Sequence, residues 1–363
     1  MAERIKILDS LRGIAALIVV FHHIFVYNTS AFEAKLTTYP WLLSVCIFIS
    51  DLNHLAVLFF FVLSGFAIAL ATQNIDIGTK VGLNLYLYRR LRRILPMYWF
   101  AILFTIIIGL ITGLIFSEPS YAIQNLLGNL LFLQTSSHVG EYWFSPYGLN
   151  GPLWSLSYEM FFYLFFPLYL RIFSFAFQKR PEHQYLFAVV FSFPLALIAM
   201  VLRQWYFVPY LSFLTQFPIW LGGYFLGHLY CKKLKADWVI FVGFISVLLG
   251  YLLNLKLHSE TILNLVQAYL LIVFPGYILY GSTRLNQWLQ GFGKLLNLFF
   301  MQLGGGSYAI YLLHYPLILW FTQTLHLALW LQLLLICIVC LLMVKLELWM
   351  NRFSFSFFKR QYV

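Results

Sequence analysis

Apolar residues fill the chain in long runs, which short polar or basic stretches separate. Most runs are about 20 residues long, the length that an α-helix needs to cross a hydrocarbon core of about 30 Å. They lack the alternation of period two that is typical of strands in an outer-membrane barrel. The pattern predicts an all-α, polytopic membrane protein with about ten transmembrane helices, near residues 8–28, 52–72, 94–116, 153–176, 184–204, 210–230, 237–256, 262–280, 304–325 and 329–350.

One segment departs from this pattern. Residues 121–136, with the sequence YAIQNLLGNLLFLQTS, are too few and too polar to span, so we expect a re-entrant or interfacial helix there. The remaining runs follow one another without an internal repeat or a polar linker, and we expect a single membrane domain over residues 1–363. Arg12 and a His pair interrupt the first run and no small-residue cleavage site follows, which favours a retained helix over a signal peptide.

Composition and charge narrow the class. Hydrophobic residues make up 62% of the chain and charged residues only 10%, far from the balance of a soluble domain. The net charge is +11, and most Lys and Arg residues fall in loops on one side of the predicted spans, with Lys35, Arg203 and Lys256 on the other. The positive-inside rule predicts cytoplasmic termini in a multi-pass protein of the cell (inner or plasma) membrane. Contact with anionic membrane lipid explains the charge, so we expect no nucleic-acid partner.

We expect no metal site. The four cysteines lack the paired spacing of metal-binding or redox motifs; they are Cys46, Cys231, Cys337 and Cys340. Ionisable residues inside the predicted spans are better candidates for chemistry, because charge at membrane depth commonly marks function.

Arg12 and His23 lie inside the first apolar run, ILDSLRGIAALIVVFHHIF. An isolated Arg at this depth costs roughly 2.5–3.5 kcal/mol on insertion scales. The two residues are about three helical turns apart, so they share a face and are separated by roughly 16 Å along the axis. His22 points roughly 100° away, where a packed or interfacial role is the more typical interpretation.

His23 and Glu159 fall at the same depth once the orientation is fixed, roughly 8–9 Å below the outer surface at about 1.5 Å per residue. A carboxylate there could hydrogen-bond the imidazole, orient it and keep it basic enough to remove a proton near neutral pH. A bond to Ser155, one turn earlier, is the alternative interpretation of Glu159.

Arg90 and Arg93 belong to YRRLRRILPMYW, at the cytoplasmic end of the third predicted span. With Arg12, near the same side, they can meet a polyanion that arrives from the cytoplasm, because guanidinium groups pair well with phosphates. Anchoring of the helix at lipid headgroups explains the same cluster equally well.

The ninth predicted span opens with GGGSYAIYLLHYPL. Ser307, Tyr311 and His314 fall on one helical face, forming a polar stripe that lipid would reject, with His314 near the bilayer midplane. The glycines at 304–306 have two interpretations, a flexible hinge and a helix start whose backbone amides approach a phosphate.

Five motifs occur in a fixed order: LDSLRGIAALIVVFHH, FFFVLSGF, RRLRRILPMYW, GPLWSLSYEMFFY and SYAIYLLHYPL. In this order they resemble the acyltransferase 3 family of membrane O-acyltransferases, over nearly the whole chain. The resemblance implies transfer of an acyl group, most often acetyl from cytoplasmic acetyl-CoA, to a hydroxyl of a carbohydrate acceptor such as a surface polysaccharide or glycolipid. Acyl-CoA is then a co-substrate, and no permanently bound cofactor is expected.

The resemblance also implies roles for individual residues. The family's Arg and His of the first span match Arg12 and His23, its paired Arg match Arg90 and Arg93, its Glu matches Glu159 and its late His matches His314. We expect His23 to act as general base, oriented by Glu159, while the Arg residues hold the phosphates of the donor. The remaining candidates for lining the site are His314, Tyr311, Ser307 and Ser64.

Two departures from the family pattern stand out. Leu58 occupies a position where many members carry an acidic residue, and we expect no appended extracytoplasmic hydrolase-like domain of the kind that some members carry. We therefore expect the membrane domain itself to complete the transfer. The alternative class is a transporter or flippase for an anionic or lipid-linked saccharide. The sequence shows no inverted repeat of the kind common in transporters, which argues against this class.

Overall fold

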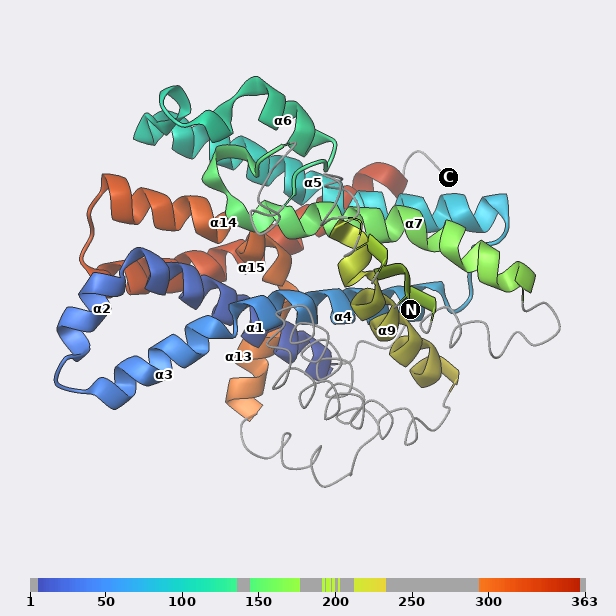
Figure 1. Ribbon diagram of the computed structural model, residues 1–363, viewed down its shortest axis with the longest axis horizontal. Coiled ribbons are helices and arrows are strands. Elements are labelled where there is room, and N and C mark those ends of the chain that lie inside the picture. Colours follow the sequence, from blue (N-terminus) through green and yellow to red (C-terminus); the bar gives the residue numbers. More distant parts are fainter. Residues whose placement is uncertain are drawn as a thin grey trace. The chain divides into compact units, whose positions relative to one another are not determined.

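The computed structural model describes residues 6–135, 144–176, 212–232 and 294–359, with a few residues between 191 and 202. Within these ranges every regular element is helical, which confirms the all-α prediction (Figure 1). The chain divides into two compact units, each built from segments distant in the sequence. The first comprises Met1–Arg4, Val57–Tyr86 and Phe161–Asn297, and the second comprises Ile5–Ala56, Leu87–Met160 and Leu298–Val363.

The described α-helices are α1 (Lys6–Tyr27), α2 (Thr29–Leu36), α3 (Pro40–Asp51), α4 (Asn53–Thr72), α5 (Lys80–Thr112), α6 (Ile123–Leu130), α7 (Trp154–Ala176), α9 (Ser212–Lys232), α13 (Lys294–Gly305), α14 (Ser307–Leu319) and α15 (Leu329–Lys359). Short 3₁₀ turns connect α5 to α7, namely η1 (Leu114–Phe116), η2 (Pro119–Tyr121), η4 (Tyr147–Leu149) and η5 (Gly151–Leu153). A π-helical turn, η7 (Trp320–Thr324), follows α14.

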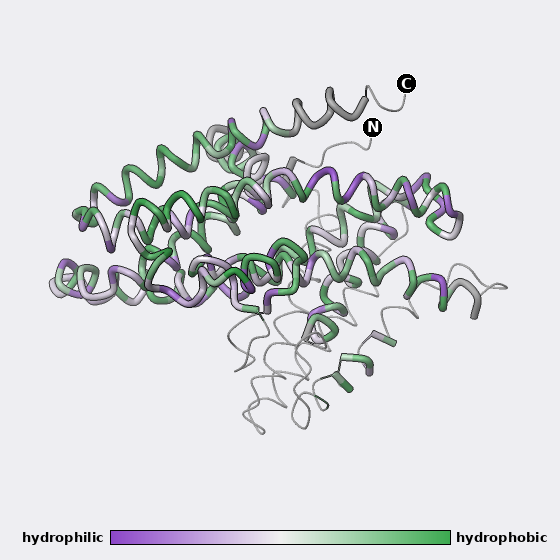
Figure 2. Tube along the Cα trace, turned by 90° about the horizontal axis from the view of Figure 1, so that it is seen from above, coloured by the Kyte–Doolittle hydropathy of each residue, from purple (hydrophilic) through white to green (hydrophobic). Residues whose placement is uncertain are grey.

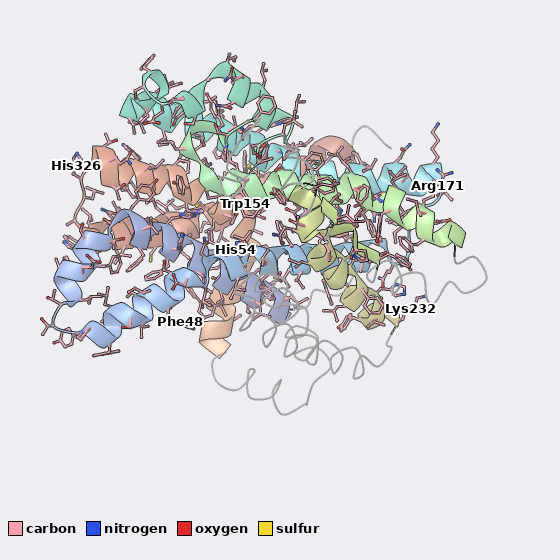
Figure 3. All side chains as sticks on the ribbon, viewed as in Figure 1. Phe48, His54, Trp154, Arg171, Lys232 and His326 are labelled. Carbon is pink, nitrogen blue, oxygen red and sulfur yellow. The ribbon has the colours of Figure 1, made fainter. Side chains whose placement is uncertain are left out.

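Four stretches of the described helices are long and apolar enough to cross a membrane: Leu8–Tyr27, Pro40–Thr72, Lys80–Thr112 and Leu329–Met350. Hydrophobic residues follow one another along most of α15 (Figure 2). Large apolar side chains project outward from such helices, as does Phe48 on α3, which is 64% exposed (Figure 3). Lipid tails suit this surface and water does not, so the chain is a membrane protein. The total of ten spans and the orientation of the termini stay predictions.

Several predicted boundaries need correction. Helix α5 begins at Lys80 rather than near residue 94, because the Arg-rich segment continues the helix instead of preceding it. Helix α3 lies between the first two predicted spans, where no helix was predicted, with Pro40 in its first turn. The predicted spans near 153–176 and 210–230 coincide with α7 and α9. Those near 237–256 and 262–280, and most of 184–204, lie outside the described residues.

In the first unit, α4, α7 and α9 pack around Trp220. A Cβ atom on Gly65 would lie 2.0 Å from the Trp220 carbonyl oxygen, and one on Gly223 would lie 2.1 Å from the Val62 oxygen. Glycine therefore lets the α4 and α9 backbones touch, as in many membrane helix pairs. The indole Nε1 of Trp220 donates to Ser64 Oγ at 3.2 Å, and Ser64 Oγ lies 2.7 Å from the Tyr163 hydroxyl.

In the second unit, α1 and α15 approach the break between α13 and α14. A Cβ on Gly304 would lie 1.7 Å from the Asp9 carbonyl oxygen, and one on Gly306 would lie 2.4 Å from Val344 Cα. The glycines at 304–306 thus allow close packing with two helices, and the predicted ninth span is divided there into α13, α14 and η7. This packing fixes the position of α14, which carries His314.

Helix α6 exposes apolar side chains and buries polar ones. Its eight residues span about 12 Å, too little to cross a bilayer, in agreement with the expectation that residues 121–136 do not span. Ile123 and Leu127 are exposed, whereas Asn125 and Asn129 are buried. Asn129 Nδ2 donates to the carbonyl oxygens of Asn125 and Ser145, both at 2.8 Å, and Asn125 Oδ1 accepts from Ser145 N at 3.1 Å.

Gly304→Ala tests the close approach of α1. In an exposed helix this substitution stabilises by about 1 kcal/mol, but here the new methyl group meets Asp9 backbone, and overpacking costs about 1–3 kcal/mol. We expect a lower melting temperature for the detergent-solubilised protein. Gly151→Ala is the control, since its Cβ would meet nothing closer than Tyr315 Cζ at 4.0 Å. An unchanged or raised melting temperature for Gly304→Ala would contradict the packing.

Candidate functional site

A line of polar side chains runs between α1, α7 and α14 in the second unit. Direct contacts join the members from Ser155 to Tyr27, and the charge of Glu159 acts on both Tyr311 and Arg12. We call this line the polar seam, and its members are Arg12, Glu159, Ser155, Tyr311, His314, His23, Tyr315 and Tyr27. Lipid offers no hydrogen bonds, so polar groups on membrane helices gather between the helices in this way.

The rings of His23 and His314 stack in the seam, with centroids 5.2 Å apart and planes inclined by 30°. Nδ1 of His314 lies 2.9 Å from the carbonyl oxygen of Ile310, which can only accept, so Nδ1 carries the proton. Nε2 of the neutral ring is then a hydrogen-bond acceptor. The side chain of His314 is 1% exposed, and Nε2 has no partner among the described residues.

Ring contacts rather than hydrogen bonds hold His23. Besides the stack, its ring meets Tyr315 edge-on at 4.8 Å, and the described residues leave both ring nitrogens without a hydrogen bond. Its neighbour differs, because His22 Nδ1 lies 2.9 Å from Ser50 Oγ and 3.0 Å from the Ser50 carbonyl oxygen on α3. The two histidines therefore contact different helices, as their offset on α1 predicts.

Two contacts tie the end of α1 to later helices. The hydroxyls of Tyr27 and Tyr315 are 2.6 Å apart. The side-chain amides of Asn28 and Gln332 exchange hydrogen bonds of 3.1 and 3.2 Å, which joins α1 to the start of α15. These bonds fix the backbone next to His23.

In the middle of the seam, Tyr311 reaches α7. Ser155 Oγ donates to the Pro152 carbonyl oxygen at 3.2 Å, so it accepts from the Tyr311 hydroxyl, 2.8 Å away. Glu159 lies one turn further along α7 and is half-buried, and its charge acts on Tyr311 and on Arg12. No hydrogen bond joins Glu159 to His23 in the described structure, and the role expected for Glu159 stays a prediction.

Arg12 lies among charged groups at the other end of the seam. Three carboxylates attract its guanidinium, those of Glu347, Asp9 and Glu159, while Arg93 repels it. Arg12 is half-buried, and its Nε has no hydrogen-bond partner in the described part of the chain. Arg12 therefore lies near a second cation as well as near carboxylates of this chain.

Glu347 on α15 is a member of this group that the sequence patterns did not single out. It is 9% exposed, and its Oε2 accepts a hydrogen bond of 2.8 Å from the backbone nitrogen of Ala309. The first-turn amides of α14 point toward this carboxylate, and a negative charge there suits the positive end of the helix dipole. The helix start that was a candidate for phosphate binding is thus capped by a carboxylate of the chain.

The other two Arg residues expected to hold a donor differ in exposure. Arg90 is 8% exposed, whereas Arg93 is exposed. Arg93 precedes Ile94, whose carbonyl oxygen accepts from the Tyr308 hydroxyl at 3.3 Å, so this part of α5 lies next to the start of α14. Arg93 is the residue of this pair that a ligand can reach in the described structure.

Asn150 holds α14 in place near the seam. Pro316 lacks an N–H, so it cannot donate to the Leu312 carbonyl oxygen one turn earlier. Asn150 Nδ2 donates to that oxygen at 3.1 Å and to Thr105 Oγ1 at 3.3 Å. A side chain from before α7 thereby replaces the missing backbone bond.

The structure brings together the candidates Arg12, His23, Glu159, Tyr311 and His314. Ser307 differs, because its hydroxyl donates to the Gly304 carbonyl oxygen at 3.0 Å. Ser64 belongs to the first unit, where it contacts Tyr163 and Trp220.

Sequence reasoning missed Glu347 and Tyr315. A lone carboxylate within the last apolar run was the available signal for Glu347. Among the described residues, no three His, Cys, Asp or Glu side chains are grouped to hold a metal ion.

An all-helical membrane protein with imidazoles, carboxylates and guanidinium groups in one buried seam has the parts for proton transfer and for binding an anion. Comparison with known protein families identifies one family. The model of the acyltransferase domain matches residues 5–346, and the chain belongs to this family, acyltransferase 3.

Individual relatives are more distant. Proteins named "Putative O-acetyltransferase" from Staphylococcus aureus strains COL, MSSA476 and MRSA252 are each 25% identical to the chain over 335 residues. The match covers 86% of this chain and 50% of each relative, so the chain spans about half their length. No solved structure matches the chain.

A double-mutant cycle tests the support of α14. Asn150→Ala should lower the melting temperature, because a buried carbonyl oxygen left without a donor costs about 1–3 kcal/mol. Pro316→Ala restores a backbone N–H that can donate to Leu312, so Asn150→Ala should cost clearly less in that background. Equal losses of melting temperature in the two backgrounds would show that Asn150 acts elsewhere.

Proposed function

We propose that the protein is a membrane-bound O-acyltransferase that moves an acyl group, acetyl from cytoplasmic acetyl-CoA, to a hydroxyl of a carbohydrate acceptor. The observation that carries this proposal is the stacked pair of His23 and His314, in a seam that continues to Arg12. Membership of the acyltransferase 3 family supports it. A surface polysaccharide or glycolipid is the acceptor that we infer, and the cell membrane is the inferred location.

The donor's phosphates need cations at the cytoplasmic face. Arg93 is exposed and suits this role, because a guanidinium can make two parallel hydrogen bonds to a phosphate. Arg12 lies nearer the seam and is shared with carboxylates, so in our proposal it stabilises the inner end of the bound donor. Arg90 is buried and supports the helix that presents Arg93.

His23 acts as the general base. Its ring nitrogens are not engaged by hydrogen bonds in the described structure, and its ring orientation is fixed by His314 and Tyr315. A base that is held in place but has an open nitrogen can accept a proton from a hydroxyl within hydrogen-bond reach.

The transfer then has balanced steps. The acceptor oxygen attacks the thioester carbonyl carbon while His23 takes the hydroxyl proton, and an ester C–O bond forms. The C–S bond breaks, and the thiolate of CoA leaves and receives the proton from His23. The negative charge of Glu159 in the seam favours the transient imidazolium.

His23→Ala tests the base. Loss of a general base lowers turnover by roughly 100-fold or more, while acetyl-CoA binding should stay close to that of the wild type, since the donor's phosphates lie elsewhere. Release of free thiol from acetyl-CoA in nanodiscs, with acceptor extract supplied, measures the reaction. His22→Ala is the matched control on the same helix and should keep most activity. Unchanged turnover in His23→Ala would remove His23 from the mechanism.

Arg93→Ala tests the donor site. A lost charge-assisted contact to phosphate should weaken acetyl-CoA binding by about tenfold, as read by calorimetry or ligand-dependent melting. Arg89→Ala, which removes another exposed cation from the same helix, should have little effect. Wild-type protein that melts cooperatively but fails to bind acetyl-CoA would favour a transporter or flippase for an anionic saccharide.

A further inference from the structure

Glu347 lies within the last apolar helix, one residue beyond the segment that matches the acyltransferase family. It is buried, although an ionised carboxylate in such a helix is costly unless charged or polar partners surround it. The neighbouring charged residue on the same helix, Lys345, is exposed. Glu347 is therefore directed inward, toward the start of α14.

Backbone amides are one set of partners. Ala309 N donates to Glu347 Oε2 at 2.8 Å, and the Tyr308 backbone also donates to this carboxylate. Gly306, just before α14, touches the backbone of Val344 on α15, which brings the carboxylate within reach of these amides. Glu347 thus caps a helix from outside it.

Two Arg residues reach the same place from other helices. Asp9 backbone packs on Gly304, and this brings the α1 segment that carries Arg12 to the break before α14. The bond from the Tyr308 hydroxyl to the Ile94 carbonyl oxygen brings Arg93 of α5 there as well. The charges of Arg93 and Arg12 both act on the Glu347 carboxylate.

We propose that Glu347 is a positioning residue for donor binding: its carboxylate is the chain's own anionic partner for Arg12 and Arg93, and the phosphates of the incoming donor displace it from them. This inference rests on the proposed function, because it assigns the same two Arg residues to acyl-CoA. Without donor, the charge of Glu347 acts on both guanidinium groups near the start of α14. With donor, the carboxylate keeps its bond to Ala309 and gives up its share of the Arg charge.

The proposal predicts that removing the charge of Glu347 strengthens donor binding. Glu347→Gln keeps an oxygen that can accept from Ala309 N but removes the competing charge. Acetyl-CoA should then bind more tightly, by roughly two- to fivefold, the range expected for charges that include the exposed Arg93. Turnover should fall, because the Arg residues are less well placed before the donor arrives. A merely structural residue would weaken binding when replaced, so the opposed changes of Kd and kcat distinguish the two roles.

The experiment compares wild type, Glu347→Gln and the control Lys345→Gln in nanodiscs, with acetyl-CoA and inorganic pyrophosphate as separate probes. Tighter binding in Glu347→Gln alone supports the proposal. Binding that is unchanged or weaker for both probes overturns it, even where wild-type binding of acetyl-CoA upholds the proposed function. If wild type fails to bind acetyl-CoA but Glu347→Gln binds pyrophosphate more tightly, the proposed function fails and the role of Glu347 as a competing anion stands.

Melting provides a second test that needs no ligand. Glu347→Gln leaves Arg12 with one fewer counter-charge, so the single variant should melt earlier than wild type. Adding Arg12→Gln to Glu347→Gln should recover part of the loss, because the excess charge is removed. A double variant that melts at the additive sum of the two single losses would overturn the charge pairing.

Discussion

The second unit depends on direct contact between helix backbones at Gly304 and Gly306. No side chain separates α13 from α1 at Gly304, or the start of α14 from α15 at Gly306, so a buried carboxylate on α15 reaches the first amides of α14. The same contact sets the depth of His314 relative to His23. In a bilayer, where burial of apolar surface between helices adds little, such close packing is a main source of specificity.

The character of the polar groups changes along α14. Ionic groups with several counter-charges gather at its start, hydroxyls paired with hydroxyls follow, and two stacked imidazoles lie furthest along together with a pair of phenols. Each successive group carries less fixed charge, so the ionic side chains are confined to the start of this helix. Among the described members of the ionic group, Arg93 alone is exposed.

The sequence predicted those features that depend on local periodicity. Helical class, the shared face of Arg12 and His23, the different direction of His22 and the short helix within 121–136 follow from spacing and length alone, and family membership followed from ordered motifs. The roles of Glu347 and Tyr315 could not be predicted in this way, because their partners lie on helices distant in the sequence. The early start of α5 was missed because Arg residues were taken as the end of a span, whereas long Arg side chains can remain on a helix whose backbone bonds are satisfied internally.

The bond between Asn150 and Leu312 has a consequence for biogenesis. The chain is synthesised from its amino terminus, so the side-chain amide of Asn150 lacks its acceptor, the Leu312 carbonyl oxygen, until 162 further residues have been made. His23 is separated from His314, the ring that stacks on it, by an even longer stretch of chain. The part of the polar seam on α1 and α7 is therefore synthesised before the α14 side chains that contact it. A chain halted before α14 would leave the polar groups of α1 and α7 without these partners, so the polar seam forms only once α14 has been synthesised.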